Sequence, residues 1–343
     1  MLDDDAIPTG DLVPYGWDER WAALASAHEG ATPGRVLRHD GVGLVCATEN
    51  GVEMLMLGPR LDPMPVVGDW IVVRGEHPVA VLERTSLLTR RAAIGNNEQS
   101  LAANVDLVLL VCGLDRPVKP GRIERGAALA HDAGARPYVV LTKAALVDDG
   151  EDTAEAIREE LGLAVLVTSV KEGRGLDELR RVVAGHTVVL LGESGAGKSR
   201  LTNALVGADV ATVGAVRAGD AKGRHTTTTR QLHLLPDGGT LIDTPGIRAV
   251  GLGAHNEGVE ATFTDIDDLA DQCRFNDCTH DREPGCAVRE AIESGELDRA
   301  RFDRHVAMQQ EADAAARRAS PGEVRRHQAG LSRYQRSLPK RKK

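Results

Sequence analysis

Residues 192–199 read Gly-Glu-Ser-Gly-Ala-Gly-Lys-Ser, which fits the phosphate-loop pattern G-x-x-x-x-G-K-[ST] without a gap. Residues 187–191 are short, apolar and β-branched, as in a buried strand, and residues 200–206 carry apolar residues at helical spacing. A glycine loop between a strand and a helix turns backbone N–H groups towards a polyphosphate. These flanking elements favour a nucleotide site over a glycine-rich turn that matches by chance.

Two side chains of this loop have defined chemistry. Lys198 is expected to reach the β- and γ-phosphates, and Ser199 to offer its hydroxyl to Mg²⁺. The whole set expected to contact the nucleotide here is Gly192, Glu193, Ser194, Gly195, Ala196, Gly197, Lys198, Ser199 and Arg200.

Further phosphate-end residues are expected downstream. Asp243-Thr-Pro-Gly246 follows a predicted strand, as a D-x-x-G motif should, so Asp243 is expected to act on Mg²⁺ directly or through water. The Gly246 N–H is placed to sense the γ-phosphate. Between the motifs, residues 223–229 hold four threonines, of which Thr227 or Thr228 is favoured as a Mg²⁺ ligand and switch residue. The alternative for these threonines is the entry to a β-strand.

Two candidate base-binding loops come before the phosphate loop. Residues 141–145, Leu-Thr-Lys-Ala-Ala, follow a strand where GTPases carry N-K-x-D, and residues 168–171, Thr-Ser-Val-Lys, resemble an S-A-K loop. In the usual GTPase order these loops come last, so the order here indicates a circular permutation. The residues expected at the base are Thr142, Lys143, Ala144, Ala145, Ser169, Val170 and Lys171.

A second centre is predicted near the C-terminus. Cys273, Cys278, His280 and Cys286 offer three thiolates and one imidazole within 14 residues, a closed tetrahedral set suited to one structural zinc ion. A cluster of reduced, buried cysteines is the alternative. No ligand position is left for water, so catalysis at this metal is not expected.

Five short apolar stretches between residues 34 and 82 alternate with turn residues, which predicts a small β-barrel of the oligonucleotide-binding (OB) type. A barrel that binds no ligand is the alternative. Residues 85–104 are expected to be a connector, after which strands and helices alternate as in an α/β domain with a mainly parallel sheet. A helix containing Trp17 and Trp21 is expected first, and two helices over 289–297 and 301–317 are expected last.

Taken together, the permuted order, the five-strand domain and the Cys/His cluster resemble the ribosome small-subunit-dependent GTPases, the RsgA (YjeQ) family. The resemblance runs from about residue 33 to residue 310 and includes the stretches 67–71, 102–106, 223–228, 243–248 and 273–278. It implies a circularly permuted α/β P-loop GTPase domain with an N-terminal OB-type β-barrel and a C-terminal zinc-binding helical domain. It also implies GTP hydrolysis with Mg²⁺, stimulated by the small ribosomal subunit during its late maturation, and contacts of the barrel and zinc domain with rRNA.

The expected domains are an N-terminal extension (1–32), the RNA-binding barrel (33–90), the GTPase domain (91–255), the zinc-binding domain (256–318) and a basic tail (319–343). The net charge of −9 argues against a protein coated in basic residues, but residues 317–343 hold ten Lys and Arg against one acid, Glu323. This tail is expected to bind RNA, the alternative being a solvated tail. An acidic start and the lack of a transmembrane-length apolar run lead us to expect a cytoplasmic monomer without a membrane partner.

One departure from the family concerns the base. The family pattern is Asn-Lys-x-Asp, whereas this chain has Thr142 and Ala145 at its ends. The missing carboxylate normally accepts two hydrogen bonds from guanine, so its loss removes roughly 2–4 kcal/mol of discrimination. Thr142 keeps part of the Asn role in this interpretation, Lys143 still packs over the base, and Asp148 or Asp149 is a possible substitute.

The attacking water raises a second question, because Ile247 stands where many GTPases keep a water-orienting Gln. His225 is the candidate for this role, both by its chemistry and by the resemblance, the alternative being a surface histidine. Two other functions are alternatives. The first, which Ala145 favours, is an RNA-binding assembly factor with a weak or silent nucleotide switch. The second is a P-loop ATPase that has no role at the ribosome. The permuted order and the Cys/His set argue against the ATPase.

Overall fold

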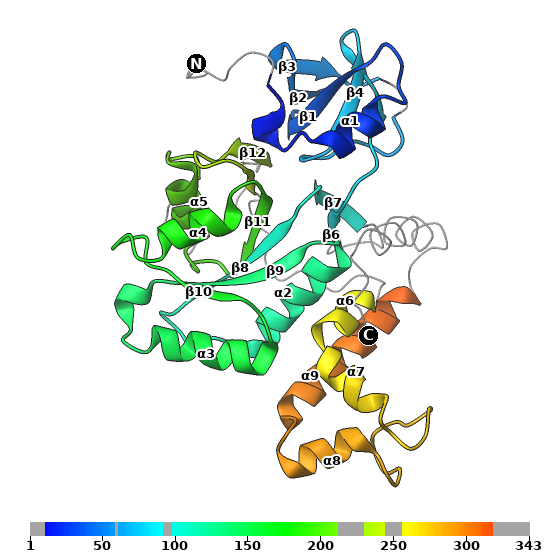
Figure 1. The fold of residues 1–343 in the computed structure, drawn as a ribbon, viewed down its shortest axis with the longest axis vertical. Helices are drawn as coiled ribbons and strands as arrows, with labels where there is room; N and C mark the ends of the chain where they lie inside the picture. The colour runs from blue at the N-terminus through cyan, green and yellow to red at the C-terminus, as the bar shows by residue number, and fades with distance from the viewer. Residues whose placement is uncertain (1–10, 59–60, 92–97, 212–229, 244–255, 318–343) are drawn as a thin grey trace, which may run out of the picture.

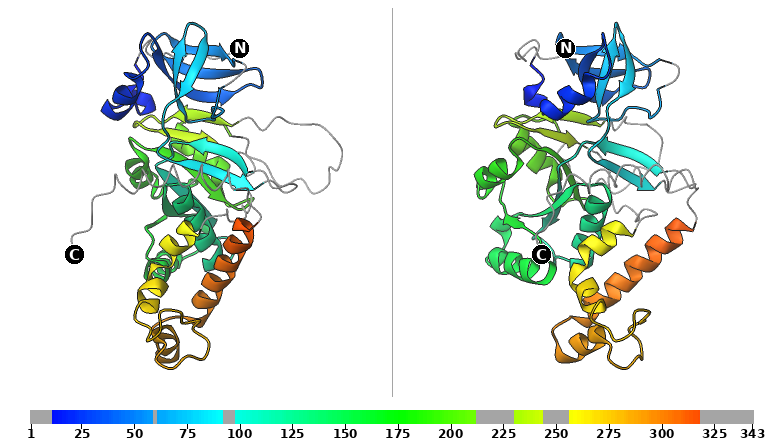
Figure 2. Two further views of the ribbon diagram at one scale, coloured as in Figure 1. Left: turned by 90° about the vertical axis from the view of Figure 1, so that its right-hand side faces the viewer. Right: turned by 45° about the vertical axis from the view of Figure 1, so that its right-hand side comes forward.

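The computed structural model describes residues 11–58, 61–91, 98–211, 230–243 and 256–317. A small β-domain, a central α/β domain and a set of C-terminal helices follow one another along the long axis (Figure 1). The two side views show the same order, with the C-terminal helices at the end opposite the β-domain (Figure 2). The predicted site residues His225, Thr227 and Gly246, and the basic tail, lie outside the described residues.

The β-domain has five antiparallel strands in the order β3-β2-β1-β4-β5. Its two edges meet where the Met56 N–H donates to the Glu76 carbonyl at 3.3 Å. One core of this domain contains no aromatic side chain and is formed by Val36, Leu44, Cys46, Leu55, Ile71 and Val73. All five predicted strands are confirmed: β1 (Thr32–His39), β2 (Gly43–Thr48), β3 (Gly51–Met56), β4 (Trp70–Arg74) and β5 (His77–Val81).

The N-terminal helix is shorter than predicted. Helix α1 (Glu19–Ala25) contains Trp21, but Trp17 precedes it, so that part of the prediction was wrong. The Asp18 carboxylate accepts the Trp21 N–H at 3.1 Å and thereby starts the helix after Trp17. Both tryptophans still pack on Trp70, with ring centroids 4.9 and 5.9 Å away.

The central domain is built on a sheet with the order β10-β9-β8-β11-β13-β12. Its strands are parallel except for β12, which runs antiparallel to β13. The mainly parallel α/β domain expected from the alternating pattern is therefore confirmed. The strands are β8 (Leu107–Gly113), β9 (Arg136–Thr142), β10 (Val165–Val167), β11 (Thr187–Gly192), β12 (Gln231–Leu234) and β13 (Thr240–Asp243).

Helices cover both faces of this sheet, as the continuous apolar runs of its strands require. On β8, Val108 and Leu110 point into the core shared with α2 and α3, while Leu109 and Val111 point into the core shared with α4 and α5. The helices are α2 (Pro120–Asp132), α3 (Gly150–Leu161), α4 (Leu176–Val183) and α5 (Lys198–Val206).

The stretch predicted as a connector contains a β-hairpin, β6 (Leu87–Arg91) and β7 (Glu98–Ala103), so that prediction was wrong. Its strands mix polar and apolar residues, which hides their period in the sequence. Tertiary contacts hold the hairpin in place: Leu88, Leu101 and Ala102 are buried, and the Ala103 N–H donates to the Val67 carbonyl at 3.0 Å.

The β-domain and the central sheet are continuous, a feature absent from the sequence-based prediction. Strand β1 pairs with β12 through Arg38 and Gln231. Beside this junction the buried Arg35 donates to the Thr187 hydroxyl at 3.2 Å and stacks over the Trp70 ring at 4.7 Å. Because Thr187 begins β11, the strand that leads to the phosphate loop is tied directly to the β-domain.

Two predicted C-terminal helices are confirmed with shifted ends, and two short ones before the Cys/His cluster were not predicted. Helix α6 packs on α2, where the Gly258 N–H donates to Asp132 at 2.6 Å. The buried Glu124 of α2 accepts from Arg301 at 2.8 Å and from Arg304 at 2.6 Å, which fastens α9 to the central domain. The helices are α6 (Glu257–Thr262), α7 (Thr264–Ala270), α8 (Ala287–Ser294) and α9 (Arg299–Ala316).

Among the described helices, none is both long and apolar enough to cross a membrane.

Candidate functional site: a phosphate loop and a separate metal cluster

The predicted phosphate loop lies between β11 and α5, as its sequence context requires. Gly195 and Gly197 have φ values of 78° and 99°, a region that side chains with a Cβ rarely adopt. A Cβ on Gly192 would collide with the Val111 carbonyl oxygen of the neighbouring strand β8. The glycines therefore allow both the tight loop and its close approach to the sheet.

Lys198 begins α5, and its ammonium group curls back over the loop. Its Nζ donates to the carbonyl oxygens of Gly192 and Glu193, at 2.6 and 2.7 Å. The positive charge thus lies within the loop, where phosphate oxygens would be its natural ligands.

Asp243 ends β13, the strand next to β11, and so lies at the same edge of the sheet as the phosphate loop. Burial raises the pKa of its carboxyl group, and the neighbouring His233 and Lys198 act in the opposite direction. A carboxylate close to the loop lysine is well placed to act on a divalent cation there.

Thr142 links the base-side loop to the phosphate loop. It ends β9, is buried, and its hydroxyl donates to the Ala196 carbonyl at 2.5 Å. A side chain at the first position of the degenerate N-K-x-D motif therefore holds the phosphate loop against β9.

Lys143 has a left-handed backbone, with φ 64°, and its ammonium lies 2.8 Å from the Asp115 carboxylate. The Lys143 and Arg116 side chains, both hydrogen-bonded to Asp115, hold the pKa of that carboxyl below its usual range. Sequence reasoning missed Asp115, although its place just after the buried strand β8 was a usable signal.

The second base-side loop lies next to the first. The Ala144 N–H donates to the Thr168 carbonyl at 3.1 Å, and Ser169, the next residue, is buried. Ala145 and Val170 are half-buried, and Lys171 is exposed. The structure thus brings together both candidate base loops and the phosphate loop, although they are distant in sequence.

A cavity of about 400 Å³ opens on the other side of the phosphate loop, between β8, β11 and α2. Its lining includes the phosphate-loop residues Glu193 and Ser194 and the basic residues Arg116 and Arg122. Arg122 forms an ion pair with Glu193. Both arginines are thus already paired, Arg116 with Asp115 and Arg122 with Glu193, and the base-side loops do not line the cavity.

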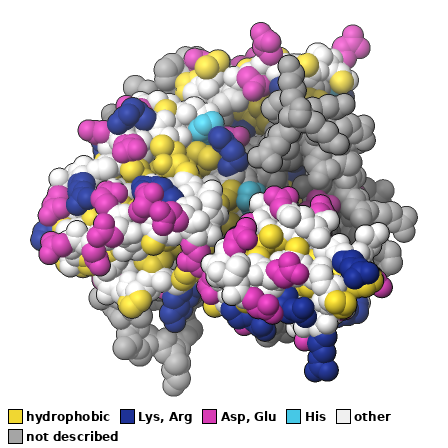
Figure 3. All heavy atoms as spheres, turned by 60° about the horizontal axis from the view of Figure 1, so that its bottom comes forward, with side chains coloured by type: hydrophobic (Ala, Val, Ile, Leu, Met, Phe, Trp, Pro, Cys, Tyr) yellow, Lys and Arg dark blue, Asp and Glu magenta, His cyan; other side chains and the backbone are white. Residues whose placement is uncertain are grey.

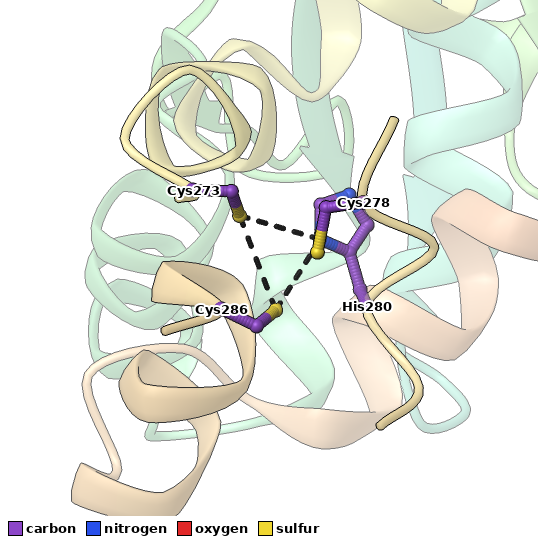
Figure 4. A group of neighbouring side chains, drawn as sticks. All are labelled: Cys273, Cys278, His280 and Cys286. Carbon is purple, nitrogen blue, oxygen red and sulfur yellow. Dashed lines mark hydrogen bonds between the residues drawn. The ribbon is translucent and has the colours of Figure 1, made fainter. Parts of the chain in front are cut away.

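The four predicted metal ligands converge in the segment between α7 and α8 (Figure 4). His280 Nδ1 lies 3.6 Å from Cys273 Sγ and 3.4 Å from Cys286 Sγ, and those two sulfurs are 4.0 Å apart. A tetrahedral ion with metal–sulfur bonds of about 2.3 Å needs sulfur–sulfur edges of about 3.8 Å. The donor set and the spacing both fit, so this group could hold a metal ion.

Local structure positions these ligands. Cys286 caps α8, where its sulfur accepts the Arg289 N–H at 3.4 Å, and His280 has a positive φ of 62°. Burial raises the pKa of Cys273, but backbone hydrogen bonds from Val288 and Ala287 lower it overall. These helix N-terminal N–H groups favour the thiolate, the form that binds metals.

Comparison with known proteins places the fold and the motifs in a family. A family model described as RsgA GTPase matches residues 81–253, about half of the chain. A protein of Streptomyces coelicolor named small ribosomal subunit biogenesis GTPase RsgA is 46% identical, over 88% of this chain and 86% of its own length. This chain belongs to the RsgA GTPase family.

Other relatives agree. A protein of the same name from Xanthomonas axonopodis pv. citri is 41% identical, with 90% of both chains covered. The crystal structure of YjeQ from Thermotoga maritima is 27% identical and superposes with a TM-score of 0.62, covering 82% of this chain and 98% of its own. YloQ, a circularly permuted GTPase, is 24% identical with a TM-score of 0.61, and covers 84% of this chain and 96% of its own. It shares the fold.

A second family model, described as ABC transporter, matches residues 180–328. That range contains the phosphate loop, which P-loop nucleotide-binding proteins have in common. The curated relatives described above are RsgA proteins, and the permuted order of the loops predicted from the sequence agrees with YloQ, a circularly permuted GTPase that shares the fold.

Proposed function

We propose that this protein hydrolyses GTP, that the small ribosomal subunit stimulates the reaction, and that the protein acts in late maturation of that subunit. GTP and GDP states would time its binding and release. The observation that carries this proposal is the 46% identity, over most of both chains, to a relative named small ribosomal subunit biogenesis GTPase. The loop geometry supports it, because the phosphate-binding residues lie in a strand–loop–helix arrangement beside Asp243.

In this proposal, catalysis is positioning plus neutralisation of charge on the phosphates. Lys198 binds the β- and γ-phosphates. Ser199, Asp243 and Thr227 would hold Mg²⁺, which would supply further positive charge to the phosphates. His225 orients the attacking water, and the Gly246 N–H contacts the γ-phosphate. Arg200 and the other loop residues shape the phosphate end of the site.

The C-terminal cluster is proposed to hold one structural zinc ion through Cys273, Cys278, His280 and Cys286, because three thiolates and an imidazole are its preferred ligands. The ion would cross-link the segment that connects α7 to α8. We also propose that the chain is divided into the five domains expected from the sequence.

The contacts with rRNA are proposed for the OB-type barrel, the metal-binding domain and the tail. Residues 33–82 hold four arginines, no lysine and six acids, so the barrel has no excess of positive charge. On the face formed by the C-terminal helices and the adjoining central domain, basic and acidic side chains are interspersed (Figure 3). The ten basic residues of 317–343 would therefore supply most of the attraction to phosphates.

Deleting residues 320–343 tests the role of the tail. Affinity for isolated small subunits should fall, and its dependence on salt should become flatter, because fewer counterions are released. Unchanged affinity at both low and moderate salt would exclude the tail from RNA binding.

GTP turnover, measured with purified small subunits and with large subunits as the control, tests the main proposal. The rate should rise with small subunits until they saturate and stay constant with large subunits. A second candidate, favoured by Ala145, is an RNA-binding assembly factor with a silent nucleotide switch. It predicts small-subunit binding that GTP, GDP and added Mg²⁺ leave unchanged.

A further inference from the structure

Ser169 carries a buried hydroxyl group that has no partner within the described part of the chain. The residue is 1% exposed, and among the described residues its Oγ has no hydrogen-bond partner. The backbone is satisfied, since its N–H donates to the Arg174 carbonyl and its carbonyl accepts the Glu172 N–H. A buried polar group without a partner costs free energy, so its presence needs an explanation.

A hydrogen bond between the two adjacent loops brings position 145 near Ser169. The Ala144 N–H donates to the Thr168 carbonyl, so the residues that follow in each loop, Ala145 and Ser169, flank this hydrogen bond. Ala145 is half-buried and has only a methyl group. A carboxylate at this position could accept the Ser169 O–H and still face a bound base.

The loss of that carboxylate has a chemical consequence for the base. Guanine presents an N1–H and an amino group as donors, and a carboxylate is purely an acceptor, so it selects guanine over adenine, whose N1 is an acceptor. The nearby acids Asp148 and Asp149 are both exposed. Lys143 can pack on either purine, and the phosphate-loop contacts do not distinguish the two nucleotides.

We propose that Ser169 is the remaining half of a hydroxyl–carboxylate pair that reads the base, and that Ala145 has turned the site into one that accepts purine triphosphates broadly, ATP as well as GTP. The inference rests on the proposed function, since it concerns the substrate range of the same site. It implies that nucleotide binding depends mainly on the phosphate contacts. It also implies that an Asp restored at position 145 would accept a hydrogen bond from the Ser169 hydroxyl.

Calorimetric titration of the full chain with GTP, ATP and ITP, all with Mg²⁺, tests this inference. The natural protein should bind GTP and ATP within about tenfold of each other, and Ala145→Asp should tighten GTP by about thirtyfold while changing ATP less than about threefold. ITP lacks the 2-amino group and should gain less than GTP. Ala145→Asn, which has the same shape without the charge, is the matched control and should give a much smaller gain.

Combining Ser169→Ala with Ala145→Asp tests whether the gain in GTP affinity depends on the hydroxyl–carboxylate pair. In the Ala145→Asp background the Ser169→Ala substitution should remove several-fold of the gain for GTP, a loss larger than any it causes in the natural background, where the carboxylate is absent. A natural preference for GTP above about a thousandfold, unaltered by Ala145→Asp, would overturn the inference and leave the proposed GTPase function standing. If that preference fell in the Asp148→Asn or Asp149→Asn variant, one of those acids reads the base instead. Failure of the natural protein to bind any of the three nucleotides would contradict the proposed function itself.

Discussion

The metal cluster and the nucleotide site are assembled in opposite ways. The four cluster residues lie within 14 positions of one segment, whose turn and helix cap bring the donor atoms within 4.8 Å of one another. The described part of the nucleotide site is drawn from the ends of β8, β9, β10, β11 and β13, over more than 100 residues. A local site can be recognised from spacing alone, while a site at a sheet edge depends on the strand order.

The two sites also differ in whether they carry every residue that their motifs require. All four cluster positions carry good metal ligands, so the set is closed. The nucleotide site has an intact phosphate loop, with Lys198 and Ser199, but lacks the acid at Ala145. If the two sites are independent, a substitution in one should leave the chemistry of the other unchanged.

The largest effect is expected from Cys278→Ala. Metal binding contributes on the order of 10 kcal/mol to such small sites, so loss of one ligand should release the ion and unfold the segment around 273–286. Metal analysis should find about one zinc per chain in the natural protein and much less in the variant. Nucleotide affinity should be retained. A natural protein that lacks metal, and a variant that melts like it, would remove the basis for a structural ion.

Lys198→Ala should reduce GTP hydrolysis by about a hundredfold or more, because the developing phosphate charge loses its nearest cation. Turnover measured with saturating small subunits is the readout, and metal content and melting temperature should not change. Hydrolysis at the natural rate would show that the catalytic assignment is wrong.

Glu124→Ala should lower the free energy of unfolding by about 3 kcal/mol, because it leaves the buried Arg301 and the partly buried Arg304 without their shared partner. Urea unfolding measures the effect. Arg125→Ala is the matched control, because it removes a more exposed ion pair between the same two helices and should cost less than about 1 kcal/mol. Equal losses would mean that the buried network does not fasten α9 to α2.

The smallest effect is expected from Thr142→Val, which keeps the side-chain shape but removes the hydrogen bond to Ala196. Affinity for both GTP and ATP should fall by about five- to tenfold, near 1 kcal/mol, because the phosphate loop loses its link to β9. Thr142→Ser retains the hydroxyl and should bind as the natural protein does. A loss confined to GTP would instead assign Thr142 to base reading.

Much of the fold could be predicted from the chain because its patterns are local. The spacing of the glycines between an apolar strand and a helix predicts the phosphate loop. Short apolar runs between turn residues predict the barrel strands. Errors occurred where tertiary contacts decide the local structure. The β6–β7 hairpin has no clear period of its own, and its buried Leu101 and Ala102 pack against the rest of the core.

For the candidate site, residue types and short spacings are enough to nominate the residues with chemistry: Lys198 and Ser199 at the phosphates, the changed motif ending in Ala145, and the Cys/His set. How these residues meet depends on the fold. It pairs Asp115 with Lys143, joins Thr142 to the phosphate loop and leaves the Ser169 hydroxyl without a partner among the residues that the structure describes. The reason is physical: residue type and short spacing are properties of the chain, whereas contacts between strand ends arise only when a sheet sets their order and register.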